Sequence, residues 1–462
     1  AQCTRGSTRS RLYRQYYRGV SVAREMKDSG VAWVGAIPLA WKIQRLKDCA
    51  QVDLGKMLTP EPKSLNDELL PYMRATNISE GEILRSSLKE MWFSKAESRK
   101  LQLRNGDILV TEGGDIGRPL FVTGLLEDER IGFQNAANRI RWRSNAKFLY
   151  FWMSWMYDSG FHINNVNVVS ISHLTKEKLE IVPIVIPPLA EQLAIADYID
   201  QQTALIDQRL CTLEEKKTVL AELRKATIHE AVTKGLNKNA KMKESSIAWI
   251  GEVPAHWSVY TLKSVASVND NVLSENISAE SIIEYVDIGA VSADKGIEFT
   301  QSMTFIDAPS RARRLVKHGD VIISTVRTYL RAIAPVFQPP SNLVVSTGFA
   351  VIRARKKVIS EFIRYSLQDE SFMSEVTARS IGVSYPAINA NELMSIQIVV
   401  PTVCEQRAIA AYLDQQTQHI DAQLATLDEQ AQVLKELRKA IIHEAVTGKI
   451  DLSGVVSGKE KR

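Results

Sequence analysis

Two stretches of the chain place apolar residues at intervals of seven. The spacing joins Ile199, Ile206, Leu213, Leu220 and Thr227 in the first stretch, and Leu413, Ile420, Leu427, Leu434 and Ile441 in the second. Charged residues fill the opposite faces. An apolar repeat of seven over four or more heptads is typical of a coiled coil. We therefore predict two long helices of roughly 45 residues, which would each span about 70 Å. Their predicted pairing residues are Ile199, Ile206, Leu213, Leu220, Leu413, Ile420, Leu427 and Leu434.

The two helical stretches are copies of each other. Residues 187–235 match residues 401–449 without a gap at 30 of 49 positions, and residues 26–50 match 242–266 at 11 of 25. Because the helices are so alike, the simplest partner for each is the other. Connections that run through whole domains would let them pair antiparallel. Two unrelated helices facing solvent would instead leave both apolar stripes in water.

The repeat divides the chain into two globular segments and two helical ones. Each globular segment has strand signals after a Gly-Asp pair, at Gly106 and at Gly319, and then a short helical stretch and a last apolar strand. The matching order predicts one α+β fold built twice, with the two α/β domains related by a pseudo-twofold axis. The predicted blocks are a basic leader at 1–25, globular segments at 26–186 and 242–400, helices at 187–241 and 401–455, and a polar tail at 456–462.

The formal charge of +5 does not describe the predicted domains. Residues 1–25 contain six arginines and one acid, so this segment alone carries +5 and the rest of the chain sums to zero. We interpret it as a disordered or non-native leader; the alternative is a basic arm that contacts phosphate. The four cysteines have no zinc-type spacing, and no apolar run suits a membrane span or a secretion signal. These features predict a cytoplasmic protein in a reducing compartment.

Sequence motifs for catalysis are nearly absent. The chain lacks the P-loop, GxGxxG, HExxH and GxSxG patterns, and also the N-P-P-Y motif of adenine methyltransferases. We interpret the glycine-rich segment 111–117 as a turn or a loop that approaches DNA. Asp53 with the Glu-Pro-Lys run at 61–63 resembles a nuclease set only loosely, and the second copy lacks it. His229 and His443 suit packing or capping near helix C-termini better than metal binding. We predict no catalytic residue, metal or cofactor on this chain.

Arginine, lysine and amide side chains gather in both globular segments. Such side chains contact phosphates and base edges in nucleic-acid interfaces. Each residue alone fits a solvated face equally well, but the set recurs on two modules and favours DNA. The candidate DNA-binding residues are Lys95, Arg99, Gly113, Gln134, Asn135, Asn138, Arg139 and Asn165 in the first segment, and Arg311, Arg313, Arg314, Thr325, Arg327, Tyr329, Arg331, Arg379, Ser384 and Tyr385 in the second.

Several repeated motifs carry a family resemblance. They are an A-W-x-G-x-x-P-x-x-W opening within 28–41 and 244–257, GD-[IV]-[LI] at Gly106 and Gly319, an EQ-x-x-IA helix start after Pro187 and Pro401, and LRKA-x-IHEAVT near each helix end. Residues 26–455 thereby resemble the specificity subunit of a type I restriction–modification enzyme. The resemblance implies that 26–186 and 242–400 are target-recognition domains and that 187–241 and 401–455 are conserved spacer helices. It also implies two modification subunits that bind S-adenosylmethionine, and two restriction subunits that use ATP and Mg²⁺.

The residues and the resemblance lead to the same functional prediction. Each domain would recognise one half of a bipartite, asymmetric site on double-stranded DNA, with the gap set by the helices. The chain itself would be non-catalytic. One rival hypothesis is a non-enzymatic coiled-coil scaffold that presents two protein-binding modules, and another is a nuclease or methyltransferase in its own right. DNA affinity that falls steeply with salt would separate DNA binding from the scaffold, since phosphate contacts require it.

Overall fold

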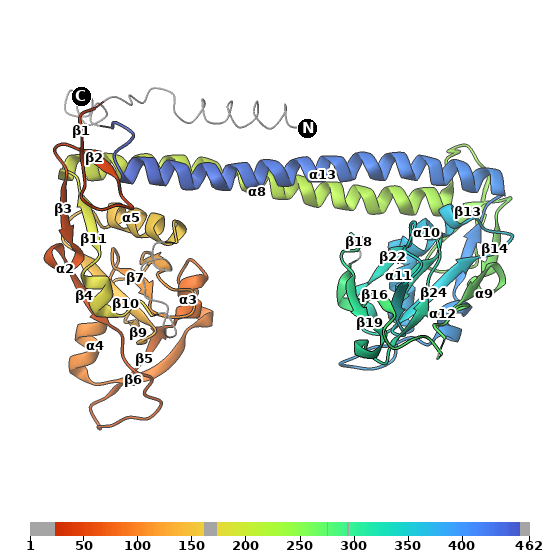
Figure 1. Cartoon of the computed structure of the whole chain (residues 1–462), viewed down its shortest axis with the longest axis horizontal. Coiled ribbons are helices and arrows are strands. Elements are labelled where there is room, and N and C mark those ends of the chain that lie inside the picture. Colours follow the sequence, from red (N-terminus) through yellow and green to blue (C-terminus); the bar gives the residue numbers. More distant parts are fainter. Residues whose placement is uncertain (1–23, 161–172, 275, 293–294, 453–462) are drawn as a thin grey trace. The chain divides into compact units, whose positions relative to one another are not determined.

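The computed structural model describes residues 24–160, 173–274, 276–292 and 295–452, which form two compact units (Figure 1). The first unit contains the chain up to Leu213 and again from Glu429, and the second contains Glu214–Asp428. Each unit therefore includes one globular segment together with part of both long helices. The polar tail predicted at 456–462 and residues 1–23 of the predicted leader lie outside the described residues.

The globular part of the first unit is α+β. Its central sheet has the strand order β4-β10-β7-β8, and a second sheet has the order β6-β5-β9. The elements are β1 (Met26–Asp28), β2 (Ala36–Pro38), β3 (Lys42–Arg45), α2 (Leu46–Cys49), β4 (Ala50–Leu54), β5 (Glu68–Met73), α3 (Ala75–Ser79), η1 (Arg85–Ser87), β6 (Lys89–Phe93), α4 (Lys95–Leu101), β7 (Ile108–Thr111), β8 (Pro119–Phe121), β9 (Gly132–Phe133), β10 (Ala137–Trp142), α5 (Ala146–Asp158), α7 (Lys176–Glu180) and β11 (Pro183–Ile186).

The globular part of the second unit repeats the four-stranded central sheet, but its second sheet has four strands where that of the first unit has three. Its sheets are β15-β24-β21-β22 and β19-β16-β23-β20. The elements are β12 (Met242–Glu244), β13 (Glu252–Pro254), β14 (Ser258–Thr261), α9 (Leu262–Val265), β15 (Ala266–Val268), β16 (Ile282–Val286), η2 (Ile288–Ala290), β17 (Val291–Ser292), β18 (Gly296–Ile297), β19 (Gln301–Thr304), η3 (Phe305–Asp307), β20 (Ala312–Leu315), β21 (Val321–Ser324), η4 (Thr328–Leu330), β22 (Ile333–Pro335), β23 (Leu343–Ser346), β24 (Phe349–Ala354), α10 (Ser360–Gln368), α11 (Glu370–Ala378), α12 (Ala390–Ser395) and β25 (Gln397–Val400).

The repeated Gly-Asp pair has a structural role in both central sheets. In the first, Arg141 on β10 donates two hydrogen bonds of 2.7 Å to the buried carboxylate of Asp107, just before β7. In the second, Arg353 on β24 makes the corresponding pair with Asp320, at 2.7 and 2.6 Å. The preceding glycines have φ values of +93° and +85°, which suit glycine in a tight turn. The motif therefore fixes the start of one central strand against its neighbour in each copy.

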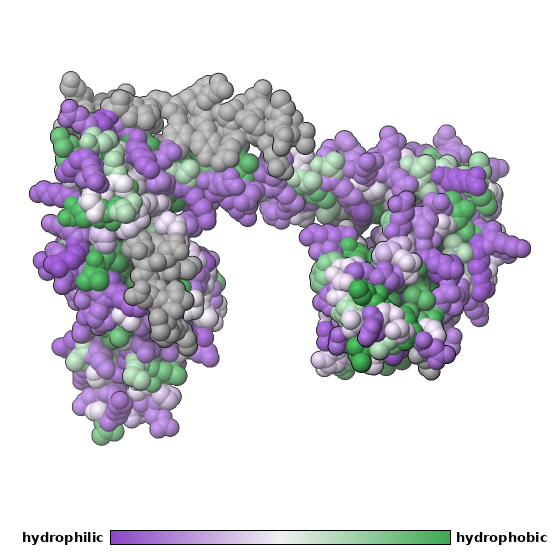
Figure 2. Space-filling model, in the orientation of Figure 1, coloured by the Kyte–Doolittle hydropathy of each residue, from purple (hydrophilic) through white to green (hydrophobic). Residues whose placement is uncertain are grey.

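The predicted long helices are α8 (Leu189–Lys234) and α13 (Val403–Val446). Each begins just after a proline-containing segment, where a missing N–H costs little, and each is followed by a glycine with φ of +73°, Gly235 or Gly448. The predicted pairing residues lie on the inward side: Ile199, Ile206, Leu213, Leu413, Ile420 and Leu434 are buried, and Leu220 and Leu427 are half-buried. Hydrophilic residues predominate on the visible outer faces of the helices (Figure 2).

Two ion pairs between the helices establish their antiparallel direction in the second unit, and a further pair joins the helices in the first. In the second unit Lys217 contacts Asp428 at 2.9 Å and Arg224 contacts Asp421 at 3.3 Å. A step of seven residues forward along α8 thus corresponds to seven backward along α13. In the first unit Arg438 of α13 pairs with Asp207 of α8. The apolar stripes of the two copies face each other in this arrangement, as the sequence repeat predicts.

A glutamate at the start of each helix binds the tryptophan of the opening motif. Glu191 accepts a hydrogen bond from the indole Nε1 of Trp41 at 2.8 Å. In the second unit Glu405 accepts bonds from Trp257 Nε1 at 3.4 Å and His256 Nε2 at 2.8 Å. Burial raises the pKa of Glu405, but these bonds and one from Thr402 outweigh it, so the pKa is lowered. The charged carboxylate therefore joins the opening motif to the helix.

The glutamine next to each glutamate joins the helix to the central sheet. The buried Gln192 donates to the carbonyl of Pro187 at 2.8 Å and accepts from Ser144 Oγ at 2.8 Å, beyond the end of β10. Gln406 likewise donates to the carbonyl of Pro401 and accepts from the backbone N–H of Ile359, both at 2.9 Å. The EQ motif is therefore a junction between domain and helix.

Each domain core is completed by the C-terminal end of a long helix. Ile442, Ala445 and Val446 of α13 join the core of the first unit, and Ile228, Ala231 and Val232 of α8 join the core of the second.

The prediction that residue 24 belongs to a disordered leader is wrong. Arg24 does not belong to a free leader, because its guanidinium lies over the Trp41 ring and donates to Glu191 at 2.9 Å.

Candidate nucleic-acid interface

Two loops of the second unit lie side by side and carry six of the predicted DNA-binding residues, Arg331 at the end of the first loop included. One follows β21 and contains Thr325, Arg327 and Tyr329; the other, residues 380–387, precedes α12 and contains Ser384 and Tyr385. The loops are joined where Val326 bridges Ala387 and where the N–H of Ile388 donates to the carbonyl of Thr325 at 2.9 Å. We call residues 325–331 and 380–387 the paired loops.

The paired loops present cationic, aromatic and hydroxyl groups to solvent. The guanidinium of Arg327 lies 4.8 Å from the centre of the Tyr385 ring, and Tyr329 is 53% exposed. Within the described residues no ion pair joins Arg327 to a carboxylate. Arg327 and Arg331 both have a φ of +51°, which is uncommon outside glycine and often found at functional sites. A free guanidinium beside exposed rings suits contacts with phosphates or bases.

Other predicted arginines of the second unit are held by the protein itself. Arg331 pairs with Glu370, Arg379 with Glu375 and Glu392, and Arg311 with Asp287 at 2.6 Å. The hydrogen bond that Arg311 donates to the Tyr285 hydroxyl and the charge of Asp287 raise the pKa of Arg311. Arg313 lies over the ring of Phe305, and burial lowers the pKa of the half-buried Arg314. These arginines stabilise the domain. The paired loops contain two predicted arginines; Arg331 pairs with Glu370, whereas Arg327 has no carboxylate partner among the described residues.

The first unit gathers four predicted residues around α4 and the end of β9. Lys95 and Arg99 are exposed on α4. Gln134 and Asn135 follow β9 and are half-buried; the N–H of Asn135 donates to the carbonyl of Lys56 at 2.9 Å. Lys56 in turn pairs with Glu97 of α4 and lowers the pKa of that carboxyl to about 2, against the effect of burial. Lysine, arginine and amide groups therefore share this face of the first unit.

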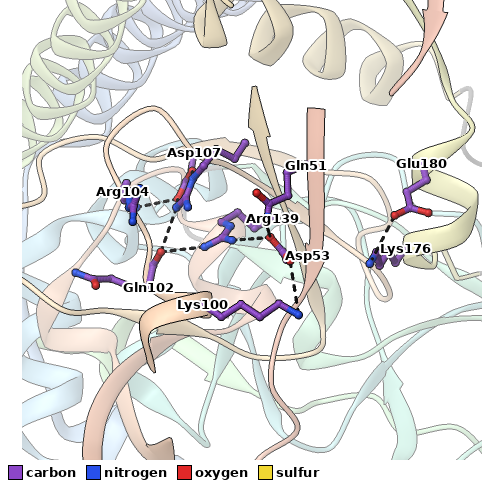
Figure 3. Close-up of polar contacts among 10 residues, drawn as sticks. Gln51, Asp53, Lys100, Gln102, Arg104, Asp107, Arg139, Lys176 and Glu180 are labelled. Carbon is purple, nitrogen blue, oxygen red and sulfur yellow. Dashed lines mark hydrogen bonds and ion pairs between the residues drawn. The ribbon is translucent and has the colours of Figure 1, made fainter. Parts of the chain in front are cut away.

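The prediction that Arg139 and Asn138 contact DNA is wrong, because both side chains are buried within the sheet that contains β10. Arg139 is 0% exposed and donates to Asp53 at 2.6 Å and to the carbonyl of Gln102 at 2.9 Å (Figure 3). Burial and the neighbouring Arg141 lower its pKa, and Asp53 opposes that shift. Asn138 is likewise 0% exposed and donates to the carbonyl of Leu174 at 3.2 Å. The two consecutive side chains point to opposite faces of the sheet, and both faces of β10 are covered.

The loop after β7 holds Gly113, another predicted residue. A Cβ on Gly113 would lie 3.0 Å from the ring of His173, so glycine is needed for close packing. Burial raises the pKa of the neighbouring Glu112, although His173 and Asn138 act in the opposite direction. Gly113 therefore lies beside a polar cluster of the domain. The predicted Asn165 lies outside the described residues.

Sequence reasoning missed two surface features of the second unit. The first is the apolar part of the paired loops, Ile381 and Val383, whose only signal is a Gly-Val-Ser-Tyr-Pro run without helix or strand periodicity. The second is an open hollow of about 890 Å³ with exposed cations in its wall, namely Lys317, Arg355, Lys356 and Arg407. These cations lie in separate parts of the sequence, so no local motif could reveal them.

Some negative observations bear on the chemistry of the described residues. In the described part of the chain, no group of three or more His, Cys, Asp or Glu side chains is placed to hold a metal ion. Across residues 24–160, 173–274, 276–292 and 295–452, no helix is both long and apolar enough to span a membrane.

Comparison with known proteins finds one family model in both globular segments of this chain. The family model described as "Type I restriction modification DNA specificity domain" matches residues 38–215 and again 254–430. The MjaVIII type I restriction enzyme specificity subunit of Methanocaldococcus jannaschii is 25% identical over 427 residues, which are 90% of this chain and 94% of the relative. The StySPI specificity subunit of Salmonella potsdam is 21% identical over 401 residues, covering 84% and 83%.

The fold also has a counterpart among solved structures. A chain from a study of complex assembly and conformational transition of the type I R-M system superposes with a TM-score of 0.66 at 18% identity. The match covers 89% of this chain and 98% of the solved one. The two proteins therefore share the fold of duplicated α+β domains and long helices.

Proposed function

We propose, from the premise that this chain belongs to the type I restriction modification DNA specificity family, that it is the sequence-recognition subunit of a type I restriction–modification complex. One observation carries the proposal: the DNA specificity domain matches the chain twice, once in each unit. In this proposal the chain binds double-stranded DNA and contributes no catalytic group. The polar side chains of the paired loops, and those around α4 and β9, would make the contacts.

Each unit would recognise one half of a bipartite site. The two units share their sheets and junctions, but the residues of their exposed loops differ, so the half-sites should differ and the target should be asymmetric. Half-site centres about 10 bp apart, one helical turn, would place both halves on one face of the duplex. The antiparallel pairing of α8 and α13 supports a role for the helices in setting this gap.

Partner subunits would carry out the catalytic steps. Two modification subunits would carry S-adenosylmethionine and methylate adenine, and two restriction subunits would use ATP and Mg²⁺ for translocation and cleavage. The relatives support assembly with other subunits of such systems, since each is named as the specificity subunit of a restriction enzyme. Because its substrate would be chromosomal or invading DNA, we place the complex in the cytoplasm.

Genome-wide mapping of N6-methyladenine tests the proposal. Cells that express the chain with its modification subunit should show a bipartite, asymmetric motif with a fixed gap, and deletion of the chain should abolish it. An assembled complex that leaves no such motif would contradict the proposal. A protein-binding scaffold would also give DNA affinity without a steep dependence on salt, whereas phosphate contacts give a linear fall of log affinity with log salt concentration.

Matched insertions in both helices test how the gap is set. Seven residues inserted after Leu213 and seven after Asp428 keep the apolar repeat in phase, and they lengthen each helix by about 10 Å. With about 3.4 Å per base pair, the gap should widen by about 3 bp while both half-sites stay the same. Insertion in only one helix is the control, because it breaks the register. Altered half-sites in the doubly lengthened protein would contradict a spacing role.

A further inference from the structure

We propose that the 381–387 loop of the second unit contacts thymine methyl groups in DNA, with Val383 as the contacting side chain. This inference rests on the proposed function and adds a specificity-determining residue to it. The loop is closed by two backbone hydrogen bonds between Ile381 and Ala387, of 2.9 and 3.0 Å. A loop closed this tightly presents its side chains in a fixed direction.

Further contacts hold the base of the loop. Thr328 Oγ1 donates to Ser380 Oγ at 2.6 Å, just before the loop, and Val326 forms a bridge with Ala387. Gly382 has a φ of +119°, and a Cβ there would lie 3.1 Å from the carbonyl oxygen of Tyr385. The turn therefore requires glycine. The loop is fixed to the body of the domain, so ordering it on binding should cost little conformational entropy.

The end of this fixed loop is apolar and lies in solvent. Val383 is 102% exposed, Ile381 84% and Tyr385 66%. Single exposed apolar residues are common, but three on one closed loop form a local cluster, and such clusters often mark binding sites. Other exposed β-branched residues of this unit, Val272, Ile282 and Ile306, are 60–71% exposed, less than either Val383 or Ile381. The exposed cluster suits a partner with a small apolar group.

The neighbouring groups favour DNA as that partner. Arg327 lies over the Tyr385 ring and is open to solvent, which suits a phosphate or a guanine edge. Ser384, between Val383 and Tyr385, supplies a hydroxyl that can bind either kind of base edge. The major groove offers one apolar group, the C5-methyl of thymine, and short aliphatic side chains contact it. A branched aliphatic side chain beside a cation and a hydroxyl therefore matches a major-groove step that contains thymine.

Substitution of uracil for thymine tests the contact, because it removes only the methyl group. The full chain, co-purified with its modification subunits, is titrated with duplexes of the mapped motif in which each thymine in turn is replaced by deoxyuridine. At a thymine of one half-site, uracil should weaken binding about fourfold, the value of one buried methyl group. Val383→Ser should remove this sensitivity, and Val383→Ile should retain it. Leu65→Ser, at an equally exposed aliphatic position of the first unit, is the matched control and should also retain it.

The outcomes separate this inference from the proposed function. A wild-type complex that does not distinguish the mapped duplex from a scrambled one would contradict the function itself. Specific binding with no uracil effect at any thymine would overturn the role of Val383, and so would an effect that persists in Val383→Ser. Loss of the modification subunits from Val383→Ser, with its DNA preference intact, would instead show that the loop contacts protein and would overturn the inference.

Discussion

The two units of this protein agree where a domain meets the helices and differ in the polar interior of the sheet. At the junctions, Glu191 and Glu405 bind a tryptophan, and Gln192 and Gln406 bind the segment between a central strand and the helix that follows it. Inside the central sheets the buried polar contacts differ between the two units. The residue two positions before the repeated arginine is Arg139 in the first unit, paired with Asp53, but Val351 in the second, bonded to Asn269 through its backbone.

This difference indicates which features the fold requires. The Asp107–Arg141 pair recurs as Asp320–Arg353 and belongs to the shared frame. The Arg139–Asp53 pair does not recur, so the same sheet forms with or without it. Replacing a buried ion pair by packed apolar residues is often neutral, whereas removing one partner is costly. The repeated features thus build the frame, and the unrepeated ones can vary between domains.

The largest predicted effect comes from breaking the unrepeated pair. Asp53→Ala leaves the guanidinium of Arg139 buried without its carboxylate and should destabilise the first unit by about 3–5 kcal/mol. Asp53→Asn combined with Arg139→Val installs the residues of the second unit and should recover most of that loss. Hydrogen exchange of the β4 and β10 amides measures both. No recovery in the double variant would show that the two sheets differ in more than this pair.

The junction glutamines should give a smaller effect that is equal in the two units. Gln192→Ala leaves the carbonyl of Pro187 and the hydroxyl of Ser144 without a partner, and Gln406→Ala does the same for the groups it binds. Each unsatisfied buried group costs about 1–3 kcal/mol, less where water enters. Exchange at the first turn of α8 or α13 should rise in the unit that carries the change. Clearly unequal effects would contradict a shared junction.

The smallest predicted effect is a pH dependence of opposite sign in the two units. A hydrogen bond to Asp369, at 3.0 Å, raises the pKa of His229 against burial, while burial and Lys449 lower the pKa of His443 to about 4. The His443 ring stacks on Trp155, with ring centres 5.1 Å apart. His229 therefore stabilises the second unit below pH about 6.5, and this stabilisation is lost as the pH rises through its folded pKa.

His443 acts in the opposite direction in the first unit. Its neutral form is favoured, so the first unit loses stability as the pH falls from about 6.5 towards 4. Exchange at the C-terminal ends of α8 and α13, followed between pH 8 and 5, measures the two effects. The variants His229→Gln and His443→Gln should each remove the pH dependence of one unit. The same sign in both units would contradict the assigned environments.

The sequence predicted the duplicated fold and the helices because their signals are local or periodic. The predicted helical blocks 187–241 and 401–455 begin two residues before α8 and α13 but run seven and nine residues past their ends, because Gly235 and Gly448 follow the helices. Connections through whole domains allowed the antiparallel pairing that the ion pairs show. The DNA candidates were predicted less well. Arg139 and Asn138 are adjacent polar residues on β10, and only the packing on both faces of the sheet shows that they are buried. The convergence of the paired loops, 55 residues apart in sequence, depends on tertiary contacts that no local motif records.

The central claim is that the shared frame carries two independent recognition surfaces. The most direct test is methylation mapping of cells whose only copy of the chain carries Arg327→Ala and Tyr385→Ala, beside cells with the unchanged protein. Both residues lie on the exposed paired loops, away from the junctions and the helices. The account predicts that one half of the motif relaxes or changes while the other half and the gap are retained. Simultaneous change of both halves, with the complex fully assembled, would contradict it.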